Sequence, residues 1–402
     1  MFILSFGLIL IVGFLVGFLL NKIKIPGLVG MIIVGLVFGP YCLNLIDSSI
    51  LNISSELRQI ALVIILTRSG LNLDIKSLKK VGRPAILMCF LPATFEIIGT
   101  MLASHFLLNL SWIEGLLLGS VLAAVSPAVV SPRMIKLIEE GYSKEHAVPE
   151  LILAGSSVDD IYTIVLFYSF LGLVQNNTFD FLSIVLVPVS IILGIIFGII
   201  VGSILLFIFK KIELPLPINI LILIGTSFLM IGVEYLLKPY ISISSLLGIM
   251  VIGMIFAFKL KNKAKELSKG YNSMWVFFEV ILFVLVGASV DFSYALNNIW
   301  MSLLVLLIGL SFRTIGVIIC VLHTKLTWKE KLFSIFAYLP KATVQASIGG
   351  IALSLGIPCG SIILTVSVLS IIIAAPIGAF LIDFFGKKLL IKEEDNINLM
   401  SI

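Results

Sequence analysis

The sequence predicts an all-α polytopic membrane protein of about 13 transmembrane helices, built as inverted repeats with two crossed, broken helices. Three observations predict this fold class. Of the 402 residues, 60% are hydrophobic and only 12% are charged, and the mean hydropathy is +1.20. Apolar runs repeatedly reach the ~20 residues that a helix needs to cross a bilayer. Two of these runs are interrupted near their middle by proline.

The order of the hydrophobic segments predicts the topology. They lie at 2–20, 27–46, 57–73, 84–108, 112–138, 150–174, 181–209, 217–237, 240–258, 272–289, 295–322, 331–355 and 359–384. Most of the 27 Lys and Arg residues fall in the loops after odd-numbered segments or in a short tail at 385–402. Because basic loops stay in the cytoplasm, we expect a plasma-membrane (inner-membrane) protein with its N-terminus outside and its C-terminus in the cytoplasm.

An internal repeat organises the segments. The first six (2–174) and the last six (217–384) superpose with an offset of seven, which inverts the second repeat, and 181–209 links them. The fifth segment is interrupted at 126–132 and its counterpart, the twelfth, at 340–350. Because proline breaks the helix hydrogen bonding, we expect Pro127 and Lys341 to support two broken helices. Matched broken helices indicate an ion site at the bilayer midplane.

Two adjacent carboxylates, Asp159 and Asp160, lie within the apolar segment 150–174. A charge at bilayer depth is costly and by default indicates function. Neighbouring helix residues point about 100° apart, so we expect the two acids to have different roles. The alternative is that one acid caps a half-helix or faces an aqueous vestibule.

Other intramembrane charges predict ion pairs. Glu96 and Arg313 occupy matched segments of the two repeats, which predicts a buried salt bridge between them. Lys341 is interpreted as a counter-charge for the carboxyl ends of the half-helices that also keeps Asp159 ionised. In the linking segment, Gly194, Gly198 and Gly202 form a double GxxxG pattern, which predicts close helix contact within the chain or in a dimer.

Three motifs carry a family resemblance: Pro340-Lys341-Ala342-Thr343-Val344-Gln345-Ala346, Ser156-Ser157-Val158-Asp159-Asp160 and Leu66-Thr67-Arg68-Ser69-Gly70-Leu71. In this order they resemble the sodium/proton antiporters of the monovalent cation:proton antiporter superfamily, NHA branch. The resemblance implies a homodimer whose protomers each have a dimerisation part and a core that moves as an elevator. We place the core at about 57–174 and 272–384 and the dimerisation part at about 1–46 and 181–258. It also implies that Asp160 is the main ligand of the cation and the proton, with Asp159 in support.

The chemistry of the residues agrees with this resemblance. Desolvation favours the neutral form of a carboxylic acid, so a carboxyl at bilayer depth can hold either a proton or a hard cation near neutral pH. Sodium, or lithium, prefers oxygen ligands, and Asp160 could be joined by Asp159, Ser156 and Thr343. If Arg313 is committed to Glu96 and Asp159 stays ionised, one proton exchanges per cation, and the exchange is electroneutral. If both acids titrate, two protons move. In the family, an Asp-Asp pair usually occurs with a lysine at the position of Arg313, and an Asn-Asp pair usually occurs with an arginine there. This sequence combines the Asp-Asp pair with the arginine.

Other classes fit less well. The two acids of an intramembrane aspartyl protease face each other from separate helices, which adjacent residues on one helix cannot do, so we expect no enzyme. A sodium-coupled organic anion symporter of similar fold would need a basic group such as Lys341 for the anion. A K⁺/H⁺ antiporter stays open as an alternative. The four cysteines lack metal-ligand spacing, and no cofactor or nucleic-acid partner is expected; the partners are the ions, membrane lipid and a second copy of the chain.

Overall fold

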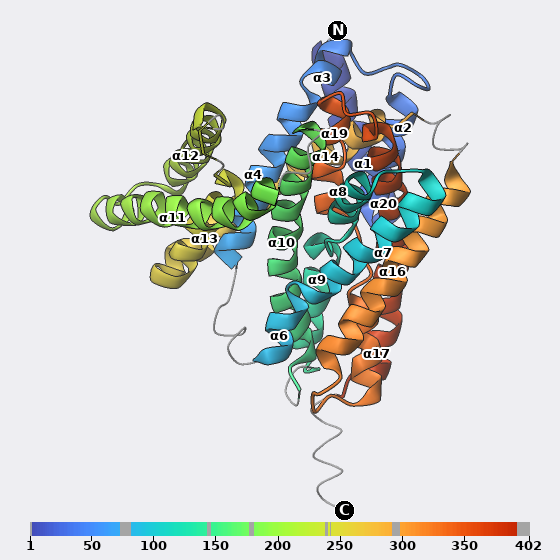
Figure 1. Cartoon of the computed structure of the whole chain (residues 1–402). Helices are drawn as coiled ribbons and strands as arrows, with labels where there is room; N and C mark the ends of the chain where they lie inside the picture. The colour runs from blue at the N-terminus through green and yellow to red at the C-terminus, as the bar shows by residue number, and fades with distance from the viewer. Residues whose placement is uncertain are drawn as a thin grey trace, which may run out of the picture.

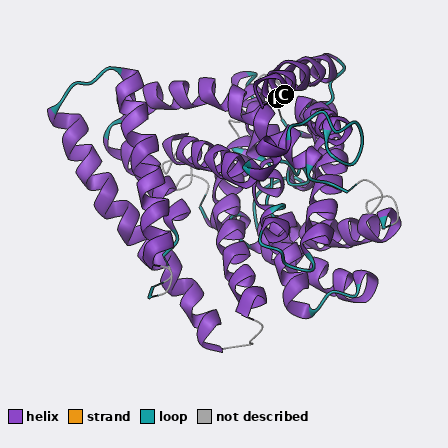
Figure 2. Ribbon diagram, turned by 90° about the horizontal axis from the view of Figure 1, so that it is seen from above, coloured by secondary structure: helices purple, strands orange, loops and turns teal. Residues whose placement is uncertain are grey.

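The computed structural model describes residues 2–72, 82–142, 146–176, 181–237, 240–241, 243–291 and 298–391. Within these ranges the regular structure is entirely helical (Figure 2). The predicted all-α class is therefore confirmed. The distal part of the tail expected at 385–402 lies outside the described residues, and its first part belongs to the last helix, which continues to Leu389.

The helices follow the predicted segments closely. In the first repeat they are α1 (Phe2–Lys22), α2 (Gly27–Phe38), α3 (Ser48–Asn52), α4 (Ser54–Asn72), α6 (Arg83–Met88), α7 (Leu91–Leu108), α8 (Trp112–Leu122), α9 (Pro127–Glu139) and α10 (Val148–Asn176). The link is α11 (Phe181–Lys211), and the second repeat holds α12 (Leu216–Leu237), α13 (Ser245–Lys259), α14 (Lys261–Ala288), α16 (Ile299–Val321), α17 (Trp328–Ala337), α18 (Thr343–Ile348), α19 (Ile351–Ser354) and α20 (Gly360–Leu389).

Many of these helices could span a membrane, to judge by their length and composition. Nine spans among the described residues are long and apolar enough to cross a bilayer, and α2 and α13 are shorter apolar helices. The number of 13 crossings is therefore not established by length and composition alone. One interruption was not expected: the segment at 84–108 divides into α6 and α7, with Pro92 in the first turn of α7.

The contacts divide the helices into two groups, and of the second group α11 and α13 lie to the left in Figure 1. In the first, α7 packs along α16 and against α8, α10 packs on α6, α8 and α9, and α20 packs on α17 and α18. In the second, α14 packs on α2 and α4, α13 packs on α4 and α11, and α1 packs on α2. The intramembrane charges singled out in the sequence lie on α7, on α10, on α16 and between α17 and α18, and therefore all belong to the first group.

The double GxxxG pattern of α11 is used within the chain. A Cβ atom on Gly198 would lie 2.5 Å from the carbonyl oxygen of Gly248 on α13, and one on Gly194 would lie 2.4 Å from the carbonyl oxygen of Ser244. Such backbone approach requires glycine. Of the two readings left open by the sequence, intrachain packing is the one that the structure contains.

Both predicted broken helices are present, and they meet at their breaks. The first break separates α8 from α9, and the second separates α17 from α18. The backbone N–H of Ser126 in the first break donates to the carbonyl oxygen of Pro340 in the second, at 2.9 Å. Pro127 is the first residue of α9, where its missing N–H costs no helical hydrogen bond, and the helix continues through Pro132. The first interruption is therefore confined to residues 123–126, shorter than the sequence predicts.

Candidate functional site

The two adjacent acids lie in α10 beside the first break, and they differ as the helix geometry predicts. Asp159 is fully buried, and its Oδ2 accepts a hydrogen bond from the backbone N–H of Val125 at 2.9 Å. The same oxygen lies 3.0 Å from Nη2 of Arg313. Asp159 is thus already held by a backbone donor and a cation. Asp160 has no such contact among the described residues.

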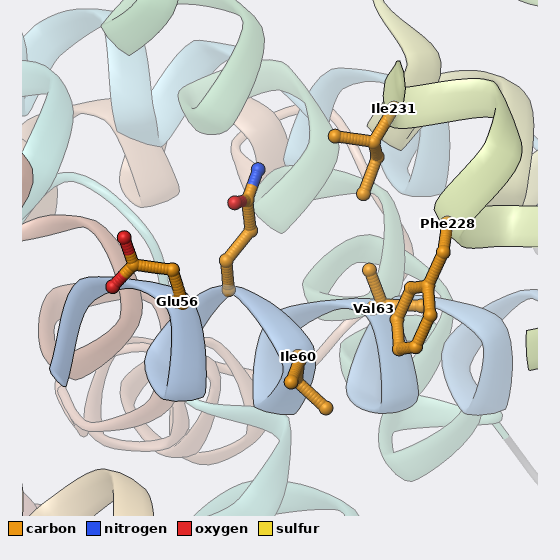
Figure 3. A pocket seen from close by; sticks show the side chains of 6 residues that line it. Glu56, Ile60, Val63, Phe228 and Ile231 are labelled. Atoms are coloured by element: carbon orange, nitrogen blue, oxygen red, sulfur yellow. The ribbon is translucent and has the colours of Figure 1, made fainter. Parts of the chain in front are cut away.

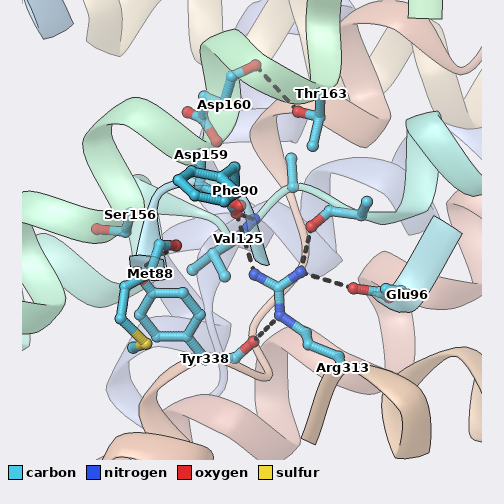
Figure 4. A network of polar contacts seen from close by, with 12 residues as sticks. Met88, Phe90, Glu96, Val125, Ser156, Asp159, Asp160, Thr163, Arg313 and Tyr338 are labelled. Atoms are coloured by element: carbon cyan, nitrogen blue, oxygen red, sulfur yellow. Dashed lines mark hydrogen bonds and ion pairs between the residues drawn. The ribbon is translucent and has the colours of Figure 1, made fainter. Parts of the chain in front are cut away.

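Arg313, on α16, is the centre of the charged network (Figure 4). Its Nη1 donates to Oε2 of Glu96 at 2.7 Å and also to the carbonyl oxygen of Ala123, while its Nε donates to the carbonyl oxygen of Tyr338 at 2.7 Å. The side chain is 1% exposed and Glu96 is fully buried. A guanidinium presents several donors in one plane, which is why a single arginine can join α7, α10 and both breaks.

Lys341, in the second break, contacts a different acid from the one expected. Its Nζ lies 2.6 Å from Oε2 of Glu96, and both side chains are fully buried. The direct counter-charge of Asp159 is Arg313. Lys341 and Arg313 share Glu96, and only Arg313 lies within ion-pair distance of Asp159; an effect of Lys341 on the charge of Asp159 would act at longer range and stays a prediction.

Oxygen atoms without protein partners lie on the same elements. Asp160 is 6% exposed, and its Oδ1 has no hydrogen-bond partner among the described residues. The same holds for the buried hydroxyls of Ser126 in the first break and Thr343 at the start of α18. The fourth expected ligand, Ser156, is buried one helical turn before Asp160, and its hydroxyl donates to the carbonyl oxygen of Leu153 at 3.3 Å. Buried polar atoms are normally satisfied, so these oxygens are candidates for contact with a ligand.

Sequence reasoning missed the contribution of Tyr338. Its ring is buried, the Arg313 guanidinium carbon lies 5.3 Å from the ring centroid, and its hydroxyl donates to the carbonyl oxygen of Met88 at 3.4 Å. A Cβ on Gly155 of α10 would lie only 1.9 Å from this hydroxyl. Gly155 thus allows α10 to approach the second break closely. In the sequence, a glycine four residues before Asp159, on the same face of the helix, could have indicated this close approach.

A cleft on the described part of the chain is separate from this network. It has a volume of about 190 Å³ and lies between α4 and α12, lined by Glu56, Gln59, Ile60, Val63, Phe228 and Ile231 (Figure 3). None of its lining residues belongs to the charged network. The candidate site is therefore defined by the buried acids and the two breaks, and the cleft plays no part in it.

Crossed broken helices with a buried carboxylate pair beside them are the features of a secondary ion transporter. Residues 7–388 match the family described as "Sodium/hydrogen exchanger, transmembrane", and the chain belongs to that family.

Several relatives can be named. The chain is 36% identical to sodium/hydrogen exchanger 9B2 of Homo sapiens over 357 residues, covering 85% of this chain and 65% of the relative. It is 33% identical to exchanger 9B2 of Mus musculus, covering 92% of this chain and 69% of the relative, and 34% identical to exchanger 9B1 of Homo sapiens, covering 85% and 68%. The chain thus spans about two thirds of the length of these relatives.

A solved structure confirms the fold. The sodium proton antiporter MjNhaP1 from Methanocaldococcus jannaschii superposes with a TM-score of 0.84, covering 96% of this chain and 98% of that one, at 22% sequence identity. At this identity the likeness concerns the architecture. The predicted fold class of a sodium/proton antiporter is therefore confirmed.

Proposed function

We propose that this protein exchanges a monovalent cation, Na⁺ with Li⁺ as a second substrate, for H⁺ across the membrane, with Asp160 as the carrier carboxylate. The observation that carries the proposal is the difference between the two acids. Oδ2 of Asp159 is engaged by Val125 and Arg313, and only its Oδ1 lacks a partner, whereas among the described residues no hydrogen bond or ion pair holds the carboxyl group of Asp160. A carboxylate at bilayer depth needs either a proton or a cation, and competition for one site is sufficient for exchange.

The oxygens that would join Asp160 around the cation come from both breaks. Thr343 and Ser126 supply buried hydroxyls without partners, and Ser156 lies one turn away on the face of Asp160. Hard cations prefer such neutral and carboxylate oxygens. Asp159 supports the site through its charge, because its Oδ2 is held by Arg313.

The charges of the network support electroneutral exchange. Three buried carboxylates, Glu96, Asp159 and Asp160, face two buried cations, Arg313 and Lys341, so one negative charge is left for one proton or one cation. Both cations are taken as charged throughout the cycle: arginine does not release its proton, and Nζ of Lys341 lies 2.6 Å from Oε2 of Glu96, the acid that it shares with Arg313. In this reading a single proton exchanges per cation. The alternative is a cycle in which Asp159 also titrates and two protons move.

An elevator-type alternating access is proposed for the two helix groups. The contacts favour a core of α6–α10 and α16–α20, with α4 and α14 on the side of the dimerisation part because they pack mainly on α13, α2 and each other. This boundary is narrower than the one drawn from the sequence at 57 and 272. We further propose a homodimer in the plasma membrane with the N-terminus outside; α1 begins and α20 ends on opposite faces, as an odd number of crossings requires (Figure 1).

The test is sodium-driven proton flux in proteoliposomes that contain the purified protein. Wild type should alkalinise the lumen when Na⁺ or Li⁺ is added outside, because each cation that enters is exchanged for protons that leave. Asp160→Asn should abolish this flux while remaining folded, since among the described residues Oδ1 of Asp160 has no hydrogen bond to lose. Substantial exchange by Asp160→Asn would overturn the proposal. K⁺ in place of Na⁺ distinguishes a K⁺/H⁺ antiporter. Clamping the membrane potential with potassium and valinomycin tests electroneutrality in separate Na⁺ assays: a rate or reversal point that follows voltage would refute it.

The organic anion symporter is less well supported. Lys341 would have to bind the anion, but its ammonium is fully buried and lies 2.6 Å from Glu96. An anion at this position would have to displace that carboxylate. Sodium binding that is unaffected by added carboxylates would agree with the cation/proton reading.

A further inference from the structure

Arg58, near the start of α4, is a buried cation outside the charged network. Its side chain is 4% exposed, and its Nε donates to the carbonyl oxygen of Ser54, one turn earlier on the same helix, at 3.1 Å. Its Nη1 is buried and has no hydrogen-bond partner among the described residues. None of the ion pairs in the described part of the chain includes Arg58. Burying a charge without a partner is costly, so Arg58 is a candidate for a function.

The guanidinium of Arg58 lies against the junction of α18 and α19. A Cβ atom on Gly350 would lie 2.0 Å from Nη1 of Arg58 and 2.9 Å from its Cζ. Gly350 is buried and is the N-cap of α19, and its φ of −93° is one that any residue can adopt. The space taken by the guanidinium, and not the backbone conformation, is therefore what requires a glycine at this position.

The electrostatics of α18 favour a cation at this junction. Gly349, directly before Gly350, is the C-cap of α18. The carboxyl end of a helix carries partial negative charge, because its last carbonyl groups have no helical donors. Arg58 thus lies where a positive charge is favoured, although no carboxylate pairs with it in the described structure. A full charge is attracted less strongly to such partial charges than to a buried carboxylate, so this contact is easier to break than a buried ion pair.

Arg58 and Gly350 belong to different helix groups. α4 packs on α13 and α14 in the second group, whereas α18 and α19 pack on α20 in the first. The start of α4 directly follows α3, and α3 and α19 both lie towards the end of the molecule that carries the N-terminus (Figure 1). The Arg58–Gly350 contact therefore joins the two groups on the side of the N-terminus.

We propose that Arg58 is a releasable contact that holds the core against α4 on the side of the N-terminus while ions exchange on the opposite side, and that it leaves Gly350 when the core moves. The inference rests on the proposed elevator-type exchange. It gives Arg58 a role in access to the ion site and none in ion binding, because the contacts of its side chain are with Ser54 and Gly350. A glycine surface and the absence of a carboxylate partner both allow the guanidinium to separate from the core.

The test is a reversible crosslink between positions 58 and 350. Arg58→Cys and Gly350→Cys are combined in a protein whose four native cysteines are replaced by alanine, and the pair is joined with a short bifunctional methanethiosulfonate. Arg58→Cys also removes the guanidinium that a Cβ at position 350 would meet. We expect the crosslink to form and to abolish sodium-driven proton flux in proteoliposomes. Reduction with dithiothreitol should restore the flux.

The matched control joins two helices of the same group. Arg133 of α9 and Asp383 of α20 form an ion pair at 3.1 Å, and both helices belong to the proposed core. Arg133→Cys/Asp383→Cys should be crosslinked by the same reagent and keep its flux, because this crosslink does not connect the two groups.

Two results of the crosslinking would overturn the proposal. A crosslinked protein that still transports would place positions 58 and 350 in one rigid body, and failure of the crosslink to form would exclude the contact. If the double variant is not folded or has no flux before crosslinking, Arg58→Cys alone is treated with a membrane-impermeant thiol reagent on each side of the membrane. Position 58 should react from the side of the N-terminus, because movement of the core exposes it, and absence of reaction would also overturn the proposal.

Failure of the proposed function would be recognised separately. Wild type without sodium-dependent proton flux would refute the exchange itself. The labelling of Arg58→Cys needs no flux, so it would still decide whether this contact opens.

Discussion

Replacing Glu96 by glutamine should destabilise the protein strongly. The change removes one negative charge and keeps the size of the side chain. Oε2 of Glu96 is 2.7 Å from Arg313 and 2.6 Å from Lys341, and all three side chains are at most 1% exposed. Arg313 keeps Asp159 as a partner at 3.0 Å, so the cation that loses its direct ion pair is Lys341.

The magnitude follows from the burial of Lys341. Removing one partner of a buried ion pair typically costs about 3–5 kcal/mol, because the other charge is left buried and unpaired. We therefore expect Glu96→Gln to lower the free energy of unfolding by about 3–5 kcal/mol. Much of this loss should be recovered in the double variant Glu96→Gln/Lys341→Met, because the unpaired ammonium is then absent as well.

The assay is unfolding of the detergent-purified protein, for the single variants Glu96→Gln and Lys341→Met and for their combination. Together they form a double-mutant cycle. Asp383→Asn is the matched control, since it breaks an ion pair with Arg133 of 3.1 Å in which Asp383 is 49% exposed. An exposed pair of this kind contributes about 0–1 kcal/mol.

Two results would refute the reasoning. If Glu96→Gln is as stable as the Asp383→Asn control, Glu96 does not neutralise buried cations. If Lys341→Met does not restore stability to Glu96→Gln, the loss does not arise from an unpaired Lys341, and the sharing of Glu96 between two cations is not the source of its effect.

Three further predictions concern neighbouring contacts. Asp159→Asn should lower the free energy of unfolding by roughly 1–3 kcal/mol, because charge-assisted hydrogen bonds from Val125 and Arg313 are weakened. It should also reduce sodium/proton exchange in proteoliposomes. A variant with wild-type stability and wild-type flux would contradict this prediction. Gly155→Ala should lower the stability measured by thermal unfolding by about 1–3 kcal/mol, since its Cβ would lie 1.9 Å from the Tyr338 hydroxyl. Tyr338→Phe removes this hydroxyl and should relieve part of the loss. If Gly155→Ala costs the same with Tyr338 and with Phe at this position, the clash is excluded. Glu330→Ala should lower the free energy of unfolding by about 0.5–2 kcal/mol, because it removes the capping box with Thr327 at the start of α17. Glu330→Gln should retain most of this cap and most of the stability. Equal losses of stability in the two variants would place the effect in the contact with His146 instead.

The fold class was predictable because the bilayer imposes it. Backbone groups inside a membrane must be satisfied within their own helix, so apolar runs of sufficient length have to be helical. The two broken helices were visible for a similar reason: Pro127 and Pro340 lie near the middle of apolar runs, and α8/α9 and α17/α18 separate beside them. The break between α6 and α7 carries the same kind of signal in Pro92, the ninth residue of the segment expected at 84–108, and this signal was overlooked.

The location of the candidate site was also predictable in part. Asp159 and Asp160 are the two adjacent acids of an apolar helix, and helix geometry alone requires them to face different surroundings. Glu96 and Arg313 could be matched through the repeat, and the structure brings them to 2.7 Å. Each of these inferences depends on sequence spacing or on symmetry between the repeats.

The partner of each charge was decided only by the tertiary structure. Glu96, Asp159, Arg313 and Lys341 come from α7, α10, α16 and the second break, and their contacts join residues 154 to 245 positions apart. Sequence spacing does not define the rotation of one helix against another, and a shift of one residue turns a side chain by about 100°. Lys341 therefore could not be assigned to Glu96, nor Gln345 to the carbonyl oxygens of Leu122 and Ala124, until the helices were packed. The sequence by itself determined that charges would be buried at the crossing of two broken helices, because the bilayer and proline act locally; packing decided which of them neutralise one another.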